Sequence, residues 1–359
     1  MSAIATSPEN AWIAALIDQR LGDYRLDSCI GRGGFGLVFQ CTHVPSDRRF
    51  AIKVMTPTSD IEVLADFENE GRLLQTLNGC DGIINYVDGG AETFPFQGPG
   101  GVSLPIELRF HVLVLADGNL EELLRDPSIR SDLGWTERLR IWREAVRGVM
   151  QMHRQGVVHR DLKSSNCLLV VNGKQTTVRL TDLGRAKSLT VPPVHMPIQY
   201  QTGRGDFRFA APEALFWQAG SSADDFRAAD YYGLGSLLTE LVSGQPMTAL
   251  AIGDYRQALI EGRADFDAGV RRDLDVLVGK YRHAVSEVVE TLPLTIQDDA
   301  RHVLSSLCHP DPSQRALASF SRDRHSRDRL SWVLRRTDIM TRRLSIEARA
   351  LRLREKVNA

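Results

Sequence analysis

Apolar residues follow two different periods along the chain. From 24 to 54, short runs rich in β-branched and aromatic residues are separated by turn residues, and this pattern predicts antiparallel strands. From 61 to 77 the apolar positions recur at helical spacing, and two more strand-like runs cover 84–92 and 108–116. The Gly/Pro-rich insert between these two runs, 94–105, is predicted to form a mobile loop.

Helical periodicity dominates after Asp117. The amphipathic runs that predict helices cover 119–126, 136–155, 212–218, 230–244, 255–290 and 298–307. A strand-rich part joined to a helix-rich part through one short connection predicts an α+β fold with two lobes and a cleft between them. We expect a small lobe with an antiparallel sheet and one main helix, and a larger lobe that is mainly α-helical.

Two further segments flank these lobes. Ser7, Pro8 and Glu9 form a helix-start signal, and this helix is expected to run to about Arg20 and to end near Gly22. The chain is therefore predicted to divide into four parts. They are an N-terminal helical extension at 1–22, the small lobe at 23–117, the large lobe at 118–320 and a basic amphipathic helix at 321–359.

The composition is typical of a globular protein with a large core. The 359 residues are 43% hydrophobic and 25% charged, with a formal net charge of −1. The five cysteines are scattered and show no C-x-x-C spacing, which argues against a disulfide framework or a zinc site and favours a reducing, cytoplasmic location. No apolar run approaches the ~18 residues of a membrane-spanning helix, so no transmembrane segment is expected.

The C-terminal segment 321–359 carries 12 Arg or Lys residues against 5 Asp or Glu, a surplus of seven positive charges. One set of its apolar residues shares a helical face and comprises Leu330, Val333, Met340, Leu344 and Leu351. A second set recurs every seven residues beside it and comprises Trp332, Ile339, Ile346 and Leu353. We expect the helix to pack back on the large lobe. A helix-binding partner or a dimer is the next alternative, and an anionic membrane or nucleic acid is the least favoured.

A glycine-rich motif lies between the first two predicted strands. Residues 31–38, GRGGFGLV, fit the pattern G-x-G-x-x-G-x-V. A dinucleotide-binding fingerprint would need a helix after the first strand, whereas a second strand follows here. A glycine hairpin can fold over a triphosphate and offer it backbone N–H groups, although a merely flexible hairpin would show the same spacing.

Lys53 lies among apolar residues on a predicted strand. Lysine is almost never fully buried without a partner. Glu70 borders the buried face of the following helix, three and four residues before Leu73 and Leu74, and is the candidate partner. An exposed lysine on an edge strand is the alternative.

Residues 159–166, HRDLKSSN, follow a helix and a short strand and therefore lie in a loop, where no core packing requires charged groups. Asp161 can accept a hydroxyl proton or orient that hydroxyl, Lys163 can neutralise a phosphate oxygen, and Asn166 can bind a divalent cation. Asp182 follows a predicted strand and precedes Gly184, which permits a sharp turn. Two oxygen ligands, a glycine loop and a paired lysine suit Mg²⁺ with a nucleoside triphosphate.

With these motifs in this order, the chain resembles the eukaryotic-type Ser/Thr protein kinase family from about 24 to 320. The resemblance implies transfer of the ATP γ-phosphate to Ser or Thr hydroxyls of protein substrates, with Mg²⁺ as cofactor. It implies Asp161 as catalytic base, with Lys163 and Lys53 as catalytic residues and Asn166 and Asp182 as metal ligands. The residues that it assigns to nucleotide binding are Gly31, Gly33, Gly34, Gly36, Val38, Ala51, Lys53, Glu70, Leu115, Ala116, Asp117 and Leu168.

The resemblance also implies structural pairs. Glu213, in the motif APE, would pair with Arg315, and Asp230 would brace the catalytic loop from beneath. Asp206 departs from the family pattern, which has threonine at this position. We expect Asp206 to pair with Lys163, because an unpaired carboxylate so near Asp161 would repel it.

Arg160, next to Asp161, is the family's mark of control by activation-loop phosphorylation. The candidate phosphorylation sites are Ser188, Thr190 and Thr202, and the sequence does not choose among them. Two other readings stay open. In the first, the chain is a pseudokinase scaffold that binds nucleotide or partners without catalysis. In the second, it is a phosphotransferase that acts on a small molecule.

Overall fold

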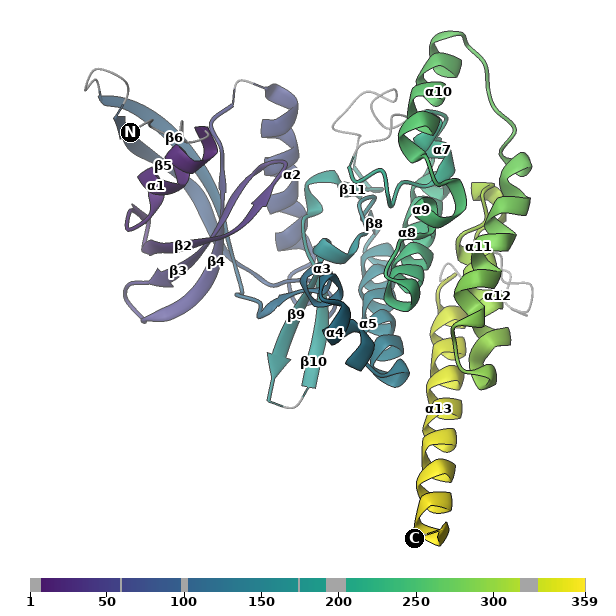
Figure 1. Cartoon of the computed structure of the whole chain (residues 1–359). Helices are drawn as coiled ribbons and strands as arrows, with labels where there is room; N and C mark the ends of the chain where they lie inside the picture. Colours follow the sequence, from purple (N-terminus) through teal and green to yellow (C-terminus); the bar gives the residue numbers. More distant parts are fainter. Residues whose placement is uncertain are drawn as a thin grey trace, which may run out of the picture. The chain divides into compact units, whose positions relative to one another are not determined.

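The computed structural model describes residues 8–58, 60–97, 103–173, 175–191, 205–316 and 329–358. The chain forms two compact units, Met1–Asp117 and Gly118–Ala359, which carry the purple-to-blue and the blue-to-yellow colours of Figure 1. The first is called the sheet unit and the second the helical unit. Together they confirm the predicted α+β fold, with a smaller antiparallel-sheet part and a larger, mainly helical part.

The sheet unit is built on one six-stranded sheet in which all neighbouring strands are antiparallel. In sheet order the strands are β1 (Arg20–Leu21), β2 (Tyr24–Gly33), β3 (Gly36–His43), β4 (Arg48–Met55), β6 (Ser103–Leu113) and β5 (Tyr86–Gln97).

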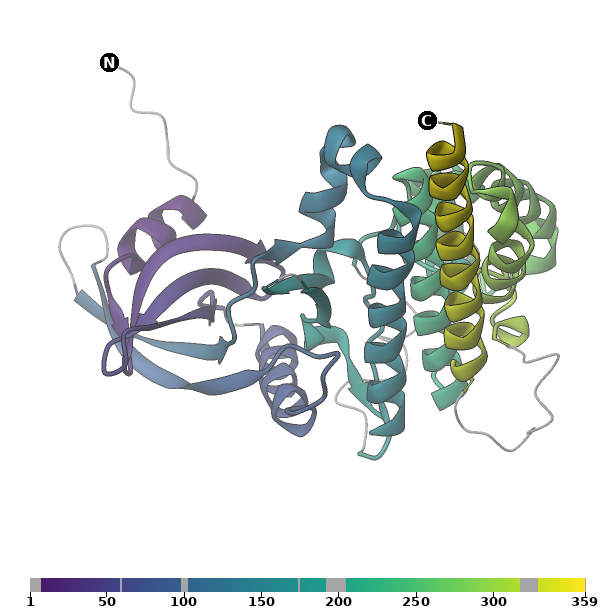
Figure 2. The same ribbon diagram turned by 90° about the horizontal axis from the view of Figure 1, so that it is seen from below.

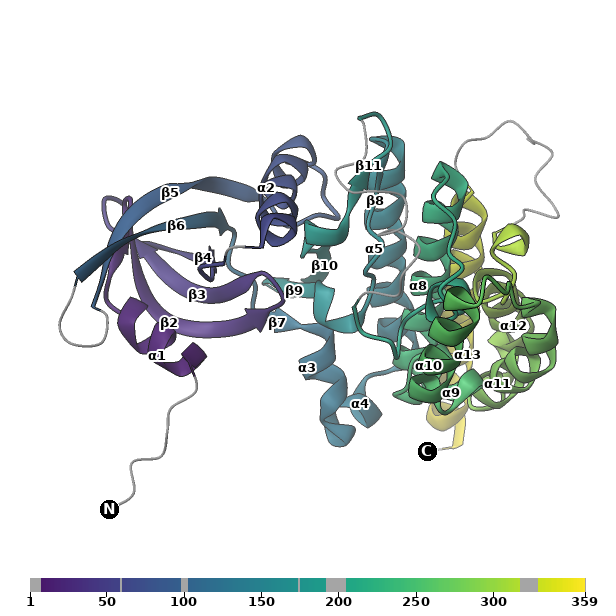
Figure 3. The same ribbon diagram turned by 90° about the horizontal axis from the view of Figure 1, so that it is seen from above.

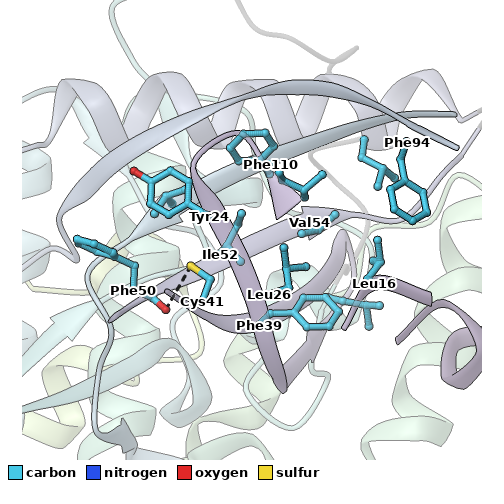
Figure 4. Packing of buried hydrophobic residues seen from close by; sticks show 14 residues of the cluster. Leu16, Tyr24, Leu26, Phe39, Cys41, Phe50, Ile52, Val54, Phe94 and Phe110 are labelled. Carbon is cyan, nitrogen blue, oxygen red and sulfur yellow. Dashed lines mark hydrogen bonds between the residues drawn. The ribbon is translucent and has the colours of Figure 1, made fainter. Parts of the chain in front are cut away.

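The two faces of this sheet differ because side chains alternate along each strand. On one face Phe39, Ile52 and Val54 belong to a buried apolar cluster, which Figure 4 shows from close by. The opposite face carries Val38 and Lys53, which are paired across β3 and β4. The core face stabilises the sheet, so the other face remains for a ligand or a helix.

The N-terminal helix is shorter than predicted. Helix α1 covers Pro8–Leu16 and packs Leu16 into the cluster on the core face of the sheet. Residues Arg20–Leu21 then form strand β1, which pairs with β2 through a turn at Gly22, whose φ is +57°. The predicted end near Arg20 is wrong because these residues gain strand pairing instead. The predicted cap, Ser7, lies outside the described residues.

The Gly/Pro-rich insert is mostly strand. Phe94 pairs with Ile106 and Phe96 with Leu104, so β5 and β6 continue side by side almost to the tip (Figure 3). Apolar packing explains the difference, because Phe96 stacks on Trp12 of α1 at a ring distance of 4.6 Å. Pro95 is tolerated because it lies on β5, an edge strand. Only 98–102 of this insert lie outside the described residues.

Helix α2 (Ile61–Thr76) begins at Asp60, whose side chain accepts a hydrogen bond from the Glu62 amide. It lies on the opposite side of the sheet from α1 (Figure 2). Its buried residues include Phe67, Leu73 and Leu74. The helical period therefore predicts this helix correctly and places Glu70 on its buried side.

The helical unit contains a helix in each segment predicted to be helical after Asp117, but the run predicted over 255–290 is interrupted at 268–273. Its α-helices are α3 (Leu120–Arg125), α4 (Pro127–Asp132), α5 (Trp135–Arg154), α7 (Pro212–Leu215), α8 (Ala223–Ser243), α9 (Met247–Ile252), α10 (Tyr255–Asp267), α11 (Val278–Glu290), α12 (Gln297–Leu307) and α13 (Ser331–Asn358). Its strands are β7 (Gly118–Asn119), β8 (Val157–Val158), β9 (Cys167–Asn172), β10 (Gln175–Leu180) and β11 (Lys187–Ser188).

Helices α5 and α8 form the centre of the helical unit. Trp142 of α5 is fully buried, and its indole nitrogen donates a hydrogen bond to the Leu234 carbonyl of α8 at 2.8 Å. Helix α13 lies along α5 (Figure 2). In the described part of the chain, no helix is both long enough and apolar enough to cross a membrane.

Candidate active site

The glycine motif forms the turn between β2 and β3, where Gly33 pairs with Gly36. A side chain on Gly34 would meet nothing within 4 Å, so the tip of this hairpin is open. Gly36 differs, because a Cβ there would collide with the backbone of Val54. Close packing of β3 against β4 thus requires Gly36, while Gly31, Gly33 and Gly34 leave the backbone of the hairpin accessible.

Lys53 and Glu70 form a buried ion pair, as predicted. The Lys53 Nζ lies 2.9 Å and 2.7 Å from the two carboxylate oxygens of Glu70. The residues are only 6% and 1% exposed. Breaking such a pair leaves an uncompensated buried charge, so each side chain fixes the other. The amine is thereby held on the sheet face that also carries Val38 and Ala51.

His111 of β6 fixes α2 against the sheet. Its ring stacks on Phe67 at 4.1 Å, and Nε2 lies 3.0 Å from the Phe67 carbonyl oxygen. A Cβ on Gly71 would lie only 2.5 Å from this ring, so glycine is needed for the close approach. Burial lowers the pKa of His111 to about 4, which keeps the ring neutral beside Lys53. No sequence pattern indicated this contact.

In the helical unit, Asp230 of α8 holds the loop that follows β8, as predicted. Its carboxylate accepts hydrogen bonds from the backbone amides of His159 at 2.9 Å and Arg160 at 2.7 Å, and lies 2.8 Å from Nε2 of His153. Burial alone would raise the pKa of Asp230, but the hydrogen bond with His153 holds it below its ordinary value. Arg160 adopts a φ of +66° in this loop, a conformation that is costly without such support.

Asp161, Lys163 and Asn166 are brought together in this loop. Lys163 Nζ lies 3.0 Å from Oδ2 of Asp161. The amide nitrogen of Asn166 donates to the backbone oxygen of Asp161 at 2.8 Å and to its carboxylate at 3.3 Å. These contacts orient the Asp161 carboxylate and turn the amide nitrogen of Asn166 inward, which leaves its side-chain oxygen as the atom that could hold a cation.

Asp182 lies at the same end of the β9–β10 hairpin as Asn166. Cys167 and Leu180, the neighbours of Asn166 and Thr181, pair across the two strands, and the Thr181 amide donates to the Asn166 carbonyl at 3.1 Å. The sharp turn falls on Asp182 itself, which has φ 60° and ψ 66°. Gly184 lies instead within the short 3-10 helix η3 (Leu183–Arg185). The expectation that Gly184 makes this turn is therefore wrong.

The predicted pairing of Asp206 with Lys163 is wrong. The Asp206 carboxylate pairs with Arg208 at 2.5 Å, and Arg208 also lies 3.5 Å from Glu121 of α3. Burial alone would raise the pKa of Asp206, but hydrogen bonds from Arg208 hold it below its ordinary value, and Lys163 adds only a weaker attraction. Arg208, two residues along the same segment, reaches Asp206 with a planar fork, whereas Lys163 pairs with Asp161.

Gly205 is a site residue that the sequence analysis missed. Its φ is +104°, and a Cβ there would lie 2.6 Å from Oδ1 of Asp161. The segment that contains Asp206 therefore approaches the Asp161 carboxylate through a residue without a side chain. Sequence patterns alone do not separate this glycine from those that only make turns.

Gly205→Ala is expected to lower phosphotransfer activity at least tenfold, because the new methyl group displaces the Asp161 carboxylate by an ångström or so, which costs about 10²-fold in well-positioned sites. The matched control is Gly269→Ala. Gly269 also has a positive φ, +67°, but a Cβ added there would meet nothing within 4 Å. Both variants should lose about 1–3 kcal/mol of stability in urea unfolding from backbone strain. Full activity in Gly205→Ala would contradict this placement.

Glu240 of α8 is a second group that sequence reasoning missed. Ser164, in the loop of Asp161, donates to its Oε1 at 3.1 Å, and Oε2 has no hydrogen-bond partner among the described residues. Burial raises the pKa of Glu240 from 4.5 to about 7. The loop that carries Asp161 thus rests on a carboxyl group whose neutral form is favoured by folding.

Glu240→Gln is expected to remove a pH dependence of stability. At pH values between the pKa of Glu240 in the unfolded state and its higher pKa in the folded state, the folded state binds one proton more. The free energy of unfolding therefore falls as pH rises through this range. Relative to Glu240→Gln, the wild type should lose about 2–3 kcal/mol of unfolding free energy between pH 5 and pH 7. Urea unfolding of both proteins at several pH values measures this difference. A constant difference would show that Glu240 stays ionised in the folded protein.

The remaining predicted nucleotide residues are divided between the units. Val38 and Ala51 lie on β3 and β4, and Leu115, Ala116 and Asp117 follow β6 at the end of the sheet unit. Leu168 lies on β9 in the helical unit and pairs with Asn119 of β7.

Glu213 and Arg315 form the predicted buried pair. The guanidinium lies 2.6 Å and 2.7 Å from the two carboxylate oxygens, and Arg315 is 1% exposed. Arg315 also donates to the carbonyl oxygens of Ala228, His309 and Pro310. This pair anchors the end of the segment that carries Asp206.

Comparisons with known proteins agree with this geometry. A family model described as the protein kinase domain matches residues 24–321, most of the chain. The chain therefore belongs to the protein kinase family.

Among curated proteins, the chain is 28% identical over 273 residues to the serine/threonine-protein kinase PknA of Corynebacterium glutamicum, which covers 72% of this chain and 52% of that protein. It is 31% identical over 232 residues to PknA of Mycobacterium tuberculosis, covering 62% and 47%. It is 27% identical over 300 residues to calcium-dependent protein kinase 29 of Arabidopsis thaliana, covering 82% and 47%. The chain spans about half the length of these relatives.

Proposed function

We propose that this protein is a Ser/Thr protein kinase that transfers the γ-phosphate of ATP to Ser or Thr hydroxyls of protein substrates. The observation that carries the proposal is the cluster of Asp161, Lys163 and Asn166, held from beneath by the buried Asp230 carboxylate. Phosphoryl transfer to an alcohol requires three groups: a carboxylate that accepts the hydroxyl proton, a cation that binds phosphate, and an oxygen that binds the metal ion. The named relatives are Ser/Thr kinases, which supports the choice of acceptor.

Each residue has a specific task in this proposal. Asp161 accepts the proton of the substrate hydroxyl, or orients that hydroxyl, from the position that Asn166 and Lys163 fix. Lys163 also stabilises negative charge on a phosphate oxygen. Lys53, locked by Glu70, binds phosphate oxygens as a rigid point charge.

The donor set fits ATP with Mg²⁺. The Asn166 amide oxygen and the Asp182 carboxylate are hard oxygen ligands of the kind that Mg²⁺ takes in small number, with phosphate and water completing its shell. The open glycine hairpin offers backbone N–H groups to phosphates. When bound, Mg²⁺ neutralises charge on the phosphate oxygens.

The five free thiols also support a reducing cytoplasm as the location.

Incubation with Mg²⁺ and ATP labelled at the γ-phosphate tests this function, with the wild type and Asp182→Ala compared on a general protein substrate and on a metabolite pool. We expect label on Ser or Thr of protein with the wild type only. Label on a small molecule would support the small-molecule phosphotransferase. No label from either protein, with intact folding, would support the pseudokinase scaffold.

We also propose control by phosphorylation of the segment after Asp182. Arg160 and Lys187 both lie against the Phe226 ring, at 4.9 Å and 4.8 Å from its centroid. Burial, followed by repulsion from Arg160, lowers the pKa of Lys187, so a phosphate placed between the two cations would relieve this repulsion. Ser188 of β11 pairs with Val157 of β8, whereas Thr190 is exposed, which favours Thr190 of these two. Thr202 lies outside the described residues.

Phosphatase treatment tests this control. We expect the treated wild type to lose at least about tenfold in activity, in line with the 1–3 new charge-assisted hydrogen bonds that a phosphate forms with cations. Lys187→Ala should show a smaller loss. Mass spectrometry before and after treatment identifies the site. Equal sensitivity of both proteins would remove Lys187 from the proposed phosphate site.

A further inference from the structure

Helix α13 has two apolar faces, of which the helical unit uses one. Leu330, Val333, Met340 and Leu344 are all at most 7% exposed. Salt bridges at the same contact join Asp338 to Arg143 of α5 at 2.7 Å, and Arg336 and Arg343 to Asp299 of α12 at 2.5 Å each. As far as Leu344, this face is therefore engaged with α5 and α12, whereas Leu351 on the same face is 53% exposed.

The other apolar face is exposed. Ile339, Ile346 and Leu353 are 41%, 67% and 64% exposed, and they recur every seven residues. Ile346 follows the buried Leu344 by two residues, which places it about 200° around the helix. These three residues, called here the outer stripe, thus lie opposite the packed face. Trp332, seven residues before Ile339, packs on His302 and does not belong to it.

The spacing of the outer stripe fits one kind of occupant. A narrow row of aliphatic residues every seven positions supplies one of the two apolar positions of each heptad in the seam that a second helix packs against in a coiled coil. A helix that lies in a membrane surface needs a much wider apolar face. The stripe therefore favours a helix as its partner.

Charge then defines the chemistry of that partner. Arg335, Arg342 and Arg349 are exposed and each precede a stripe residue by four positions, about 40° around the helix. The whole of α13 carries 8 Arg or Lys residues against 3 Asp or Glu. A second copy of α13 would bring the same positive surplus, whereas an acidic helix would be attracted.

We propose that the outer stripe and its flanking arginines dock an acidic amphipathic helix of a partner protein. At Ile339 and Ile346 the site is rigid, because the opposite face of α13 is fixed there to α5 and α12, so little conformational entropy is lost when the partner binds. This proposal is independent of the phosphotransfer chemistry.

Binding of two synthetic peptides to the full chain tests the proposal. Both are helices of about 21 residues with Leu and Ile in a heptad seam; one has Glu at the flanking positions and the other Lys. Fluorescence anisotropy should show that the Glu peptide binds at least about tenfold more tightly than the Lys peptide, and that added salt weakens this binding.

Two variants locate the site. Ile346→Glu should weaken binding of the Glu peptide about tenfold, with unchanged unfolding and unchanged phosphotransfer. Leu351→Glu is the matched control, because Leu351 is 53% exposed but lies about 140° around the helix from Ile346, and its effect should stay within about twofold.

Four results would each overturn the proposal. The first is equal binding of the two peptides, and the second is an equal loss of peptide binding in the two variants. The third is a dimer in light scattering that Ile346→Glu dissociates. The fourth is binding to phosphatidylserine vesicles that Ile346→Glu abolishes. The third would assign the stripe to a second copy of the chain, and the fourth to a membrane surface.

Discussion

Asp161→Asn is expected to lower kcat by about 10²–10⁴, the usual contribution of a positioned acid or base. The amide cannot accept the proton of the substrate hydroxyl, and it replaces the carboxylate oxygen that lies 3.0 Å from Lys163. Nucleotide affinity should change little, because Lys53, the residue proposed to bind phosphate, lies in the other unit. The KM for ATP should therefore remain close to that of the wild type, while kcat and kcat/KM for the protein substrate fall together.

Steady-state phosphorylation assays, together with urea unfolding, measure this effect. Asn is close in shape to Asp, so the unfolding free energy should change by less than about 1 kcal/mol. The matched control is Ser165→Ala, in the same loop, which should retain activity within about threefold. A large loss of stability in Asp161→Asn would mean that the carboxylate serves the structure of the loop rather than the reaction.

Arg315→Met is expected to destabilise the helical unit by about 3–5 kcal/mol, because it leaves the buried Glu213 carboxylate without its counter-ion. Glu213 is only 5% exposed, and the guanidinium also satisfies three backbone carbonyl oxygens. This loss exceeds the typical effect of one core substitution. Because Glu213 ends the segment that carries Asp206, activity should also fall at temperatures where most of the protein is still folded.

Two comparisons test the physical reason. Arg140→Ala removes the surface pair with Glu137, in which both side chains are 37% exposed, and should cost at most about 0.5 kcal/mol. The double variant Glu213→Gln/Arg315→Met should be more stable than Arg315→Met alone, since it buries no lone charge. If the double variant is the less stable of the two, the carbonyl contacts of Arg315 rather than its charge pair dominate.

Local sequence patterns were sufficient to predict a contact where burial and the period of the apolar residues alone decide which side chains meet. A lysine among buried strand residues requires a counter-ion, and a glutamate on the buried side of the next helix supplies it, so the contact between Lys53 and Glu70 followed from the sequence. The loop at 159–166 was recognised because its residue types have no packing role there. The resemblance to a family added Asp230 and the pair of Glu213 with Arg315, which are 70 and 102 residues distant from their partners and carry no local signal.

Two of the errors arose because contacts between segments outweighed local preference. Residues 94–97 and 103–105 became strand because Phe96 stacks on Trp12, and the first helix ended early because Arg20 and Leu21 pair with β2. Asp206 was assigned the wrong partner because the sequence does not show which cation its carboxylate faces.

By itself the sequence determined the α+β fold, the order of its main strands and helices, and which residues have the chemistry to bind phosphate, because periodicity and residue chemistry are properties of the chain. Only the tertiary structure decided that Gly205 passes beside Asp161, that Glu240 is buried beneath the catalytic loop, and which apolar face of α13 stays exposed. These features depend on distances between segments, and a linear pattern does not encode such distances.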